Sequence, residues 1–363
     1  DRAGNLILVG GLMSVDQQGQ VVGSDLATQA QNIFEELERI LAEAGASMKD
    51  VVKHNVYFHC VGDDAKVAMF LTELDRVRGA WFPEPGPTTT ETRVGLEHEG
   101  ALILIDAWAV VGTEKERLMP RDHWQWERSL PFSQGWKVGD LIFVGGQRSM
   151  DQQGRVVGAG NIEIQTANTF ENLERVFQEA GGDRTHVMRQ NTYFRFFGEG
   201  PEVTEYWEKM TNVRSRFMAV PTSAGAGLGV SGFPDSKELI QVEGIGSLAE
   251  DRQRLQPANH WDWSIPNNPF TQGWRVGKFV FVGGQISADS KAKAVGKDLA
   301  TQTENVFRFI QSVLREAKLD ESDVIKLYIY YYAEEDWQQV ADATATISEV
   351  QRRFCPEPGP AVT

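Results

Sequence analysis

The chain has 363 residues, with 36 Lys and Arg against 51 Asp and Glu, and its formal net charge is −15. Nucleic acids and anionic membranes bind basic surfaces, so this charge argues against both as main partners and is typical of a cytoplasmic protein. The two cysteines, Cys60 and Cys355, are too far apart in sequence for a CxxC metal pair, and two cysteines make no disulfide framework. No segment approaches the ~18 uninterrupted apolar residues of a membrane span.

The first predicted elements occupy residues 6–110. A short apolar run ends in Gly10-Gly11 and predicts a buried strand stopped by a turn. Apolar residues at helical spacing then predict a helix over 25–44, with Gly45 as its stop. A strand over 51–58, a helix near 65–77 and a strand over 101–110 follow.

The same order recurs twice more, because the chain contains an internal repeat. Segment 4–11 returns as 139–146 and as 277–284, and segment 83–87 returns as 356–360. A period of about 136 residues has the size of a domain rather than of a solenoid unit. We therefore predict one domain in three copies: copy 1 at 1–118, copy 2 at 119–255 and copy 3 at 256–363.

The counterpart elements follow from this period. Helices are predicted at 162–180, 203–217, 299–317 and 337–354, and strands at 187–194, 238–245 and 324–331. The order β-β-α-β-α-β predicts an α+β fold, in which both helices pack on one face of a mixed sheet. Three copies can cover each other's open sheet faces and form a closed, trimer-like core.

The copies at the two ends are incomplete. Copy 1 has no counterpart of segment 123–135 and lacks its first strand, whereas copy 3 stops where its last strand would follow. We expect the chain to be trimmed at both ends, which would leave at most two complete clefts between copies.

The repeated motifs resemble those of a known family. Pro131-Phe132-Ser133-Gln134-Gly135, segment 139–147, segment 323–326 and segment 242–245 are similar to the RidA/YjgF/UK114 family of small enamine and imine deaminases. The resemblance implies a chorismate-mutase-like architecture and a homotrimer. For this chain it implies a monomeric pseudo-trimer with clefts between copies, and further self-association stays open.

The family's site residues map poorly onto this chain. The resemblance implies an Arg that binds a substrate carboxylate, a Glu that holds the attacking water, a Ser and a Tyr. The Arg position falls at Thr88, Thr222 and Ala361, and the Glu position falls at Leu104 and Gln241. The Ser position falls at Gly10, Gly145 and Gly283, and the Tyr position falls at Phe132 and Phe270. Thr cannot form the bidentate fork of Arg, so the substrate lacks a carboxylate, the chemistry has changed, or there is none. No catalytic residue is assigned.

Polar residues at these positions are the substrate-binding candidates. Hydroxyls of Thr88 and Thr90 would face one side of a strand, although Thr also simply suits strands. Arg93 could replace the missing cation or form a surface ion pair. Thr222 and Ser223 are the corresponding pair of copy 2.

Two repeated motifs allow a structural as well as a functional interpretation. Gln147 and Gln285 end the Gly-Gly-Gln motifs and could bind a ligand or fix a turn. The His-Trp-x-Trp segments that begin at His123 and His260 are interpreted as docking segments that lap onto the next copy, with a proton shuttle as the alternative.

The motif search predicts no cofactor and no metal. The sequence has no HExxH, P-loop, strand-linked GxGxxG or GxSxG motif. Two functions remain. The first, which we favour, is a cofactor-free hydrolase of a small imine, enamine or related C–N compound, with its small-molecule substrate in a cleft between copies. The second is a non-catalytic small-molecule binding or scaffold protein.

Overall fold

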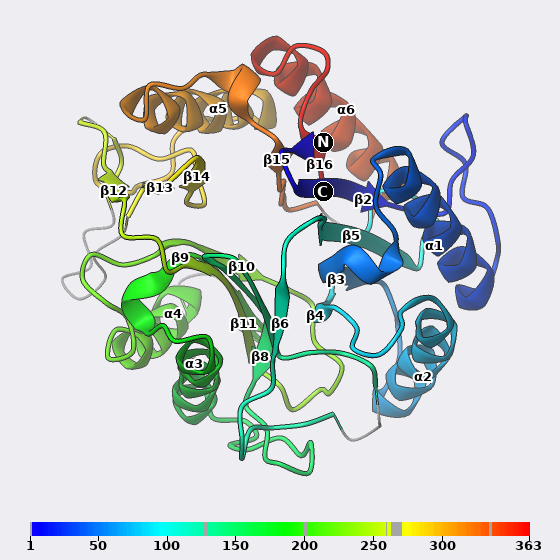
Figure 1. The fold of residues 1–363 in the computed structure, drawn as a ribbon. Coiled ribbons are helices and arrows are strands. Elements are labelled where there is room, and N and C mark those ends of the chain that lie inside the picture. The colour runs from blue at the N-terminus through cyan, green and yellow to red at the C-terminus, as the bar shows by residue number, and fades with distance from the viewer. Residues whose placement is uncertain (1, 127–129, 199–201, 259, 263–270, 334–335) are drawn as a thin grey trace.

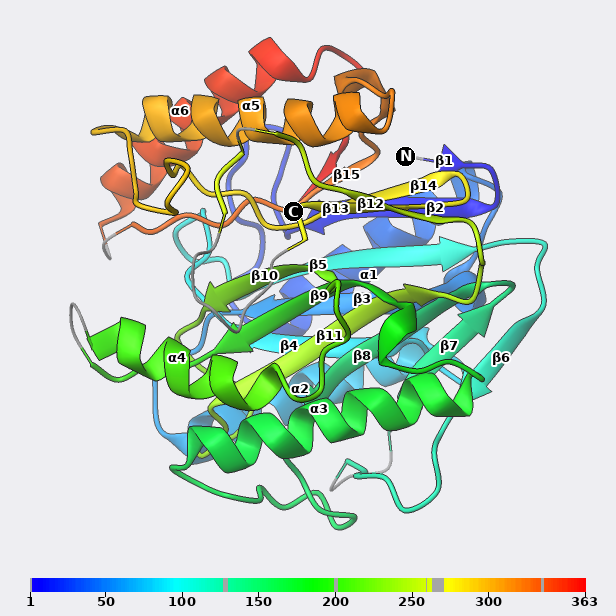
Figure 2. The ribbon, with the colours of Figure 1, turned by 90° about the vertical axis from the view of Figure 1, so that its left-hand side faces the viewer.

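The computed structural model describes residues 2–126, 130–198, 202–258, 260–262, 271–333 and 336–363. Figure 1 shows the three copies arranged around a common centre, each with a pair of helices on the outside and its strands on the inside. The view in Figure 2 shows the helix pair of copy 3 above the sheets and that of copy 2 in front of its own sheet. This arrangement confirms the predicted α+β fold in tandem copies.

Copy 1 forms a five-stranded sheet of order β1-β2-β5-β3-β4, in which only β3 and β4 run parallel. Its central strand is β5, which pairs with both β2 and β3. The elements are β1 (Arg2–Ala3), β2 (Leu6–Leu12), α1 (Leu26–Glu43), β3 (Val51–Phe58), α2 (Asp64–Trp81), β4 (Thr88–Arg93) and β5 (Ile103–Val110).

Copy 2 repeats this sheet and extends it, in the order β10-β9-β11-β8-β7-β6. Here β11 takes the central place of β5 and pairs with both β8 and β9. The elements are β6 (Lys115–Leu118), β7 (Gly135–Val138), β8 (Leu141–Arg148), α3 (Ile162–Glu179), β9 (Val187–Phe194), α4 (Glu202–Arg214), β10 (Ala224–Gly229) and β11 (Ile240–Ser247).

Copy 3 has its sheet in two parts, β12-β13-β14 and β15-β16. The predicted strand over 324–331 is reduced to the two residues of β15, because no described strand stands where β5 and β11 stand in the other copies. The elements are β12 (Arg252–Leu255), β13 (Gly273–Val276), β14 (Phe279–Val282), α5 (Leu299–Glu316), β15 (Lys326–Leu327), α6 (Trp337–Phe354) and β16 (Ala361–Val362).

The predicted boundaries between copies 1 and 2 and between copies 2 and 3 differ from those in the structure. β6 and β12 were placed at the ends of copies 1 and 2, but they pair with β7 and β13 and so belong to the sheets of copies 2 and 3. The strand expected at Thr88 and Thr90 is β4, which follows the second helix and pairs in parallel with β3. In copy 2, β10 pairs with β9 in the same way. The repeat motif marks the strand that contains the Gly-Gly pair and not the strand that precedes it, which explains the misplaced boundaries. Copy 1 retains only the short β1 before its Gly-Gly strand.

The first helix of each copy begins after a residue whose side chain caps the helix N-terminus. The side chain of Asp25 accepts a hydrogen bond from the backbone N–H of Thr28 at 2.9 Å, and Asp298 does the same for Thr301 at 2.8 Å. Asn161 is the corresponding cap in copy 2. Such N-caps satisfy backbone donors that have no partner within the helix, so α1, α3 and α5 begin at equivalent places.

A hydrophobic cluster at the common centre joins the copies. It contains Leu8 and Trp108 from copy 1, Phe143 from copy 2 and Phe281 from copy 3, all at most 8% exposed. The open sheet faces therefore cover each other, as the sequence predicted.

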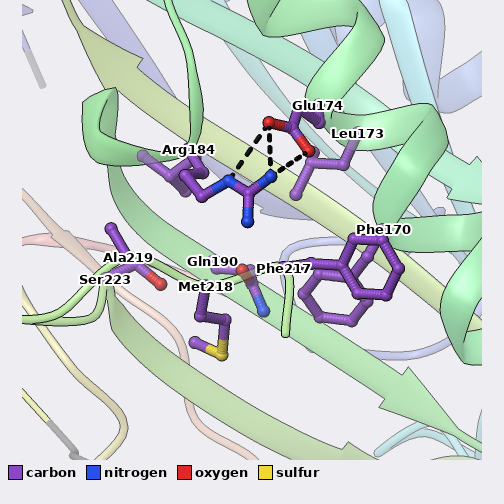
Figure 3. Close-up of a pocket in the computed structure, with 10 residues that line it drawn as sticks. Phe170, Leu173, Glu174, Arg184, Gln190, Phe217, Met218, Ala219 and Ser223 are labelled. Carbon is purple, nitrogen blue, oxygen red and sulfur yellow. Dashed lines mark hydrogen bonds and ion pairs between the residues drawn. The ribbon is translucent and has the colours of Figure 1, made fainter. Parts of the chain in front are cut away.

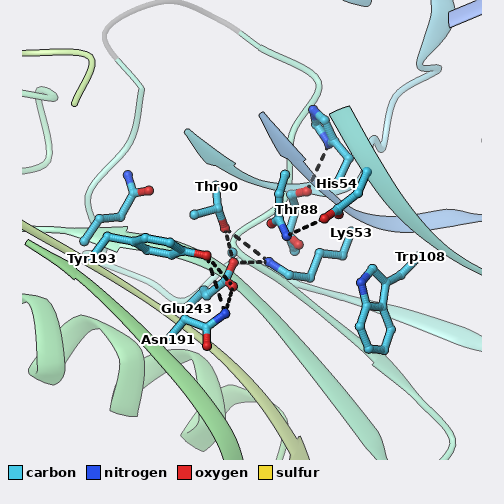
Figure 4. Close-up of polar contacts among 12 residues, drawn as sticks. Lys53, His54, Thr88, Thr90, Trp108, Asn191, Tyr193 and Glu243 are labelled. Atoms are coloured by element: carbon cyan, nitrogen blue, oxygen red, sulfur yellow. Dashed lines mark hydrogen bonds and ion pairs between the residues drawn. The ribbon is translucent and has the colours of Figure 1, made fainter. Parts of the chain in front are cut away.

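A buried polar cluster lies beside these apolar residues (Figure 4). Lys53 of copy 1 lies 2.7 Å from the carboxylate of Glu243 of copy 2. Thr90, Asn191 and Tyr193 each donate a hydrogen bond to that carboxylate, at 2.6, 2.7 and 3.1 Å. Burial opposes the charge of Glu243, but Lys53, Thr90 and Asn191 together hold the pKa of Glu243 below its usual value.

We expect acid to remove this contribution to stability. Because the folded-state pKa of Glu243 is lowered, its contribution is present above the unfolded-state value of about 4.5 and is lost as pH falls through the folded value. Urea unfolding of the wild type and Glu243→Gln at several pH values measures it. The difference in unfolding free energy should shrink below about pH 5. A difference that stays constant down to pH 3 would contradict this prediction.

Candidate functional site

The Gly-Gly pairs are the places where neighbouring copies touch. Gly10-Gly11 and Gly145-Gly146 lie within β2 and β8, so the predicted turn that would stop these strands does not form there. A Cβ on Gly145 would lie 2.9 Å from the carbonyl oxygen of Thr89, and one on Gly10 would lie 2.7 Å from that of Val362. At the third boundary, the N–H of Gly284 donates to Gly225 at 2.8 Å. The glycines therefore serve close backbone packing between copies.

The predicted candidates Gly145 and Gly283 have a further structural role. Their N–H groups donate to the carbonyl oxygens of Gln134 and Gln272, at 3.1 and 2.8 Å. Both donors are thus used within the protein.

At the boundary of copies 1 and 2, a phenylalanine fills the expected cleft. Phe132 is 1% exposed, and its ring centroid lies 5.5 Å from that of His54. The Arg78 guanidinium stands 4.3 Å from the same ring. His54 is fully buried, and its burial, with the nearby charges of Arg78 and Lys53, holds the pKa of the imidazole well below its ordinary value. This histidine is therefore neutral.

Arg78 belongs to a buried ionic network. Its guanidinium contacts the carboxylates of Asp75 and Glu91, and all three residues are at most 8% exposed. Burial opposes its charge, but Glu91 and Asp75 hold the pKa of Arg78 above its ordinary value. The backbone N–H of Glu91 donates to Gln241 at 3.2 Å, so that the candidate Gln241 ties copy 2 to copy 1.

Thr88, Thr90 and Arg93 all lie on β4, but they do not converge on one ligand site. Thr88 and Thr90 are buried, and the hydroxyl of Thr90 donates to Glu243 in the central cluster. The backbone carbonyl of Arg93, at the far end of β4, accepts hydrogen bonds from Ser231. This strand therefore holds copies 1 and 2 together.

Gln147 fixes the His-Trp-x-Trp segment of copy 2. Its side-chain oxygen lies 2.8 Å from Nε2 of His123 and accepts from the Trp124 indole at 3.0 Å. Its amide nitrogen donates to Gln134 and to the carbonyl of Gly145. Burial lowers the pKa of His123 to about 4, which leaves it neutral at pH 7. Gln285 similarly accepts from Trp261 at 3.1 Å.

Gln147→Ala is therefore expected to destabilise the protein by about 1–3 kcal/mol, because it leaves the buried Trp124 indole without an acceptor. Gln285→Ala is the matched comparison and should cost less, since Gln285 is only partly buried. Urea unfolding measures both values. Equal, negligible effects would show that these amides have no structural role.

In copy 2, the corresponding place is a pocket whose lining residues all belong to copy 2. Its cavity volume is about 20 Å³, and the empty space in and around it, which includes open solvent, is about 320 Å³. It is called the copy 2 pocket below (Figure 3). Its lining residues are Phe170, Leu173, Glu174, Arg184, Val187, Gln190, Phe217, Met218, Ala219 and Ser223.

The copy 2 pocket corresponds to the position in copy 1 where Phe132 packs against His54 and Arg78. The rings of Phe170 and Phe217 stack at 6.3 Å, as do those of Phe34 and Trp81 in copy 1. In the strand register, Gln190 takes the place of His54. Phe270, the predicted counterpart of Phe132, lies outside the described residues.

Charged and polar groups converge on this pocket. Arg184 forms a forked ion pair with Glu174, with nitrogen–oxygen distances of 3.0–3.1 Å. Figure 3 shows this pair on one side and Gln190 on another, with the stacked rings beside them. The Ser223 hydroxyl is buried without a hydrogen-bond partner among the described residues. The hydroxyls of Thr88 and Thr89 in copy 1 are buried in the same way, so the feature is not specific to this pocket.

The structure corrects one predicted equivalence. Ala224 lies opposite Arg189 as Thr88 lies opposite Lys53, so Thr222 corresponds to Gly86 rather than to Thr88. The carbonyl of Thr222 accepts from an indole at 2.8 Å, and that of Gly86 does so at 3.1 Å. The residue types of Thr222 and Thr88 match, but their places in the strand register differ by two residues.

The charged residues of these sites were not among the candidates. Arg78 and Arg214 occupy equivalent helix positions in copies 1 and 2, so comparing the copies position by position could have found them. Arg184 has no such signal, because Met48 takes its place in copy 1. Its partner Glu174 has an exposed counterpart, Glu38, in α1.

Two classes of site find no support in the described part of the chain. No three His, Cys, Asp or Glu side chains come together there as metal ligands. None of the helices described combines the length and hydropathy that crossing a membrane requires.

Comparison with known proteins gives consistent relatives for single copies. A RutC family protein of Pyrococcus abyssi is 33% identical over 109 residues, which are 30% of this chain and 80% of that protein. The 3-aminoacrylate deaminase RutC of Acinetobacter baylyi is 31% identical over 111 residues, 30% of this chain and 82% of that protein. A 2-iminobutanoate/2-iminopropanoate deaminase of Dermatophagoides farinae is 24% identical over 115 residues, 32% and 84% of the two chains.

A solved structure resembles the larger part of the chain. A chorismatase crystal structure matches 68% of this chain and 76% of its own, with a TM-score of 0.51 and 13% identity, which shows likeness of fold alone. The profile described as endoribonuclease L-PSP matches residues 2–111, 126–225 and 264–357. Since these three matches span most of its length, the chain belongs to the endoribonuclease L-PSP family, which is the RidA/YjgF family, and contains three tandem copies of it.

Proposed function

We propose that this protein is a cofactor-free hydrolase that releases ammonia from small imines or enamines in the copy 2 pocket. The observation that carries the proposal is the difference between two equivalent places. In copy 1, Phe132 packs against His54 and Arg78, whereas the described residues of copy 2 leave a pocket lined by Arg184, Glu174 and Ser223. The imine and aminoacrylate deaminases among the relatives support this reaction class.

Arg184 is suited to bind the anionic end of a substrate. Its side chain is 40% exposed, so it can be reached from solvent while Glu174 holds its orientation. A guanidinium and a carboxylate form short, charge-assisted hydrogen bonds of defined geometry. We therefore infer that the substrate carries a carboxylate, which is against the first of the three alternatives drawn from Thr88.

Glu174 is suited to handle the protons of the reaction. Water attacks the imine carbon and forms a C–O bond, and the carboxylate accepts the proton that the water loses. The same proton is then given to the nitrogen, which completes a carbinolamine. A second proton passes from the carbinolamine hydroxyl to the nitrogen, the C–N bond breaks with its electrons going to nitrogen, and ammonia leaves behind a carbonyl compound. An enamine enters the same path once its carbon has taken up a proton.

The uncharged groups would position the substrate. The Ser223 hydroxyl and the Gln190 amide can hydrogen-bond to the imine nitrogen or to the attacking water. The rings of Phe170 and Phe217 and the side chain of Met218 offer an apolar wall for a short alkyl group. The substrate class that fits is an imine or enamine of a short-chain keto acid, bound by a single chain.

Ammonia release tests the proposal. The wild-type protein is mixed with 2-aminoacrylate and, separately, with an uncharged imine of similar size, both generated in situ. We expect release above the spontaneous rate, and faster release from the carboxylated compound. Ligand binding without ammonia release from either compound would overturn the proposal in favour of a non-catalytic binding protein.

A further inference from the structure

A second hollow in copy 2 lies along the side of α3 that faces away from the copy 2 pocket. It is bounded by α3, by residues 150–153 after β8 and by residues 122–124, and it shares no lining residue with the copy 2 pocket. Its cavity volume is about 360 Å³, which is in the size range of small-molecule sites. We call this hollow the α3 groove.

One wall of the α3 groove is a polar stripe of the helix. Its side chains are spaced three and four residues apart, so they share one face of α3; they are Asn168, Glu171, Asn172 and Arg175. The stripe offers two amides, a carboxylate and one guanidinium to the groove.

The amides and the carboxylate of this stripe have acceptor oxygens without a partner among the described residues. Asn172 is 6% exposed, and its amide nitrogen donates to the carbonyl of Arg148 at 2.9 Å, which leaves its side-chain oxygen unpaired. Asn168 also uses its nitrogen alone, which donates to Ser149 at 3.2 Å. The exposed Glu171 carboxylate has no ion pair. A nearly buried amide oxygen that lines a hollow is a group that a ligand can satisfy.

A second unpaired carboxylate comes from the segment that precedes Trp124. The nearest side-chain donor to the Asp122 carboxylate is the amide of Gln152, at 3.5 Å, which is longer than an ordinary hydrogen bond. The guanidinium of Arg175 is directed to the backbone carbonyl of Asp122, also at 3.5 Å, and not to a carboxylate. Trp124 and Met150 add apolar surface to the same groove.

The other copies do not have this set of acceptors. In copy 3, Arg308 and Phe309 stand at the places of Glu171 and Asn172, so that a cation and an apolar ring replace the two acceptors. In copy 1, the residue at the place of Asn172 is Glu36, whose carboxylate is already held in an ion pair within α1. The acceptor set is therefore a property of copy 2.

We propose that the α3 groove binds a short aliphatic diamine, whose two ammonium groups pair with the carboxylates of Glu171 and Asp122. An ammonium group carries only donors and a positive charge, so it matches unpaired acceptors and carboxylates. The side-chain oxygen of Asn172 accepts from one of these groups, and the alkyl chain lies against Trp124 and Met150. A metal ion fits less well, because no three potential metal ligands come together in the part of the chain that the structure describes.

Calorimetric titration of the full chain tests this proposal. The probes are diaminobutane, butylamine and butanediol, which share one carbon chain and carry two, one and no ammonium groups. At about 0.15 M salt the Debye length is about 8 Å, which limits general attraction of amines to a chain of net charge −15. Diaminobutane should bind at least about fivefold more tightly than butylamine, and butanediol should show no saturable binding.

Two charge-reversal variants separate the α3 groove from the rest of the acidic surface. Glu171→Arg introduces the residue that copy 3 has at this position, and Glu35→Arg makes the same change at the equivalent exposed position of α1. Circular dichroism verifies that both fold. Glu171→Arg should lower the affinity for diaminobutane at least about tenfold, whereas Glu35→Arg should keep it within about twofold.

A third variant tests the second carboxylate. With Asp122→Asn, the preference for diaminobutane over butylamine should disappear, because only one carboxylate remains for two ammonium groups. Heat of binding is the readout throughout, so the result does not depend on ammonia release in the copy 2 pocket. No saturable binding of diaminobutane, equal affinities for diaminobutane and butanediol, or equal losses in the two Glu variants would each overturn the proposal.

Discussion

Arg78→Met should lower the free energy of unfolding by about 3–5 kcal/mol, because it leaves two carboxylates buried without their cation. Asp75 and Glu91 are 8% and 7% exposed, and both contact the Arg78 guanidinium. The loss should become smaller at low pH, because protonation removes the unpaired charges. Urea unfolding at pH 7 and at pH 5 measures both effects.

Arg76→Met is the matched control on the same helix. Arg76 pairs with Glu73, but its side chain is 65% exposed, and surface pairs of this kind contribute about 0–1 kcal/mol. Equal effects of the two variants would contradict the role we assign to the buried network at the boundary of copies 1 and 2.

Arg184→Met should lower kcat/KM for carboxylated imines by about 10- to 100-fold, because a charged hydrogen bond contributes ~1.5–3 kcal/mol. Met is the residue that copy 1 has at this position, Met48, so the change introduces no unusual side chain. For an uncharged imine the effect should be several-fold smaller. Steady-state ammonia release on both substrates gives the comparison.

Arg175→Met serves as its control, because Arg175 is exposed on the same helix as Glu174 and does not line the copy 2 pocket. We expect this variant to hydrolyse both substrates at the wild-type rate. An equal loss on charged and uncharged imines in Arg184→Met would mean that this guanidinium does not bind the substrate carboxylate.

The sequence was sufficient to predict the elements whose signals are local. The helix predicted over 25–44 is α1 with its two caps, Asp25 and Ala44, and the strands over 51–58 and 187–194 have the predicted bounds. Apolar periodicity, capping residues and glycine stops act within a few residues of chain, so they can be recognised without the fold.

The site depended on contacts that the sequence does not record. Phe132 fills a place between His54 and Arg78, which lie more than fifty residues away in the chain. Arg184 and Glu174 meet only because α3 and the turn before β9 pack together. The register error at Thr222 has the same origin, because a shift of two residues changes which strand partner a side chain faces.

The most direct test of the copy 2 pocket compares Glu174→Gln with Glu38→Gln in the ammonia-release assay. Glu174 lines the pocket, whereas Glu38 occupies the same helix position in copy 1 and is exposed. Removal of a general acid–base group costs about 10²–10⁴ in rate, so Glu174→Gln should lower kcat at least about 100-fold, while Glu38→Gln keeps the wild-type value. Wild-type kcat in a folded Glu174→Gln protein would contradict the assignment of the reaction to this pocket.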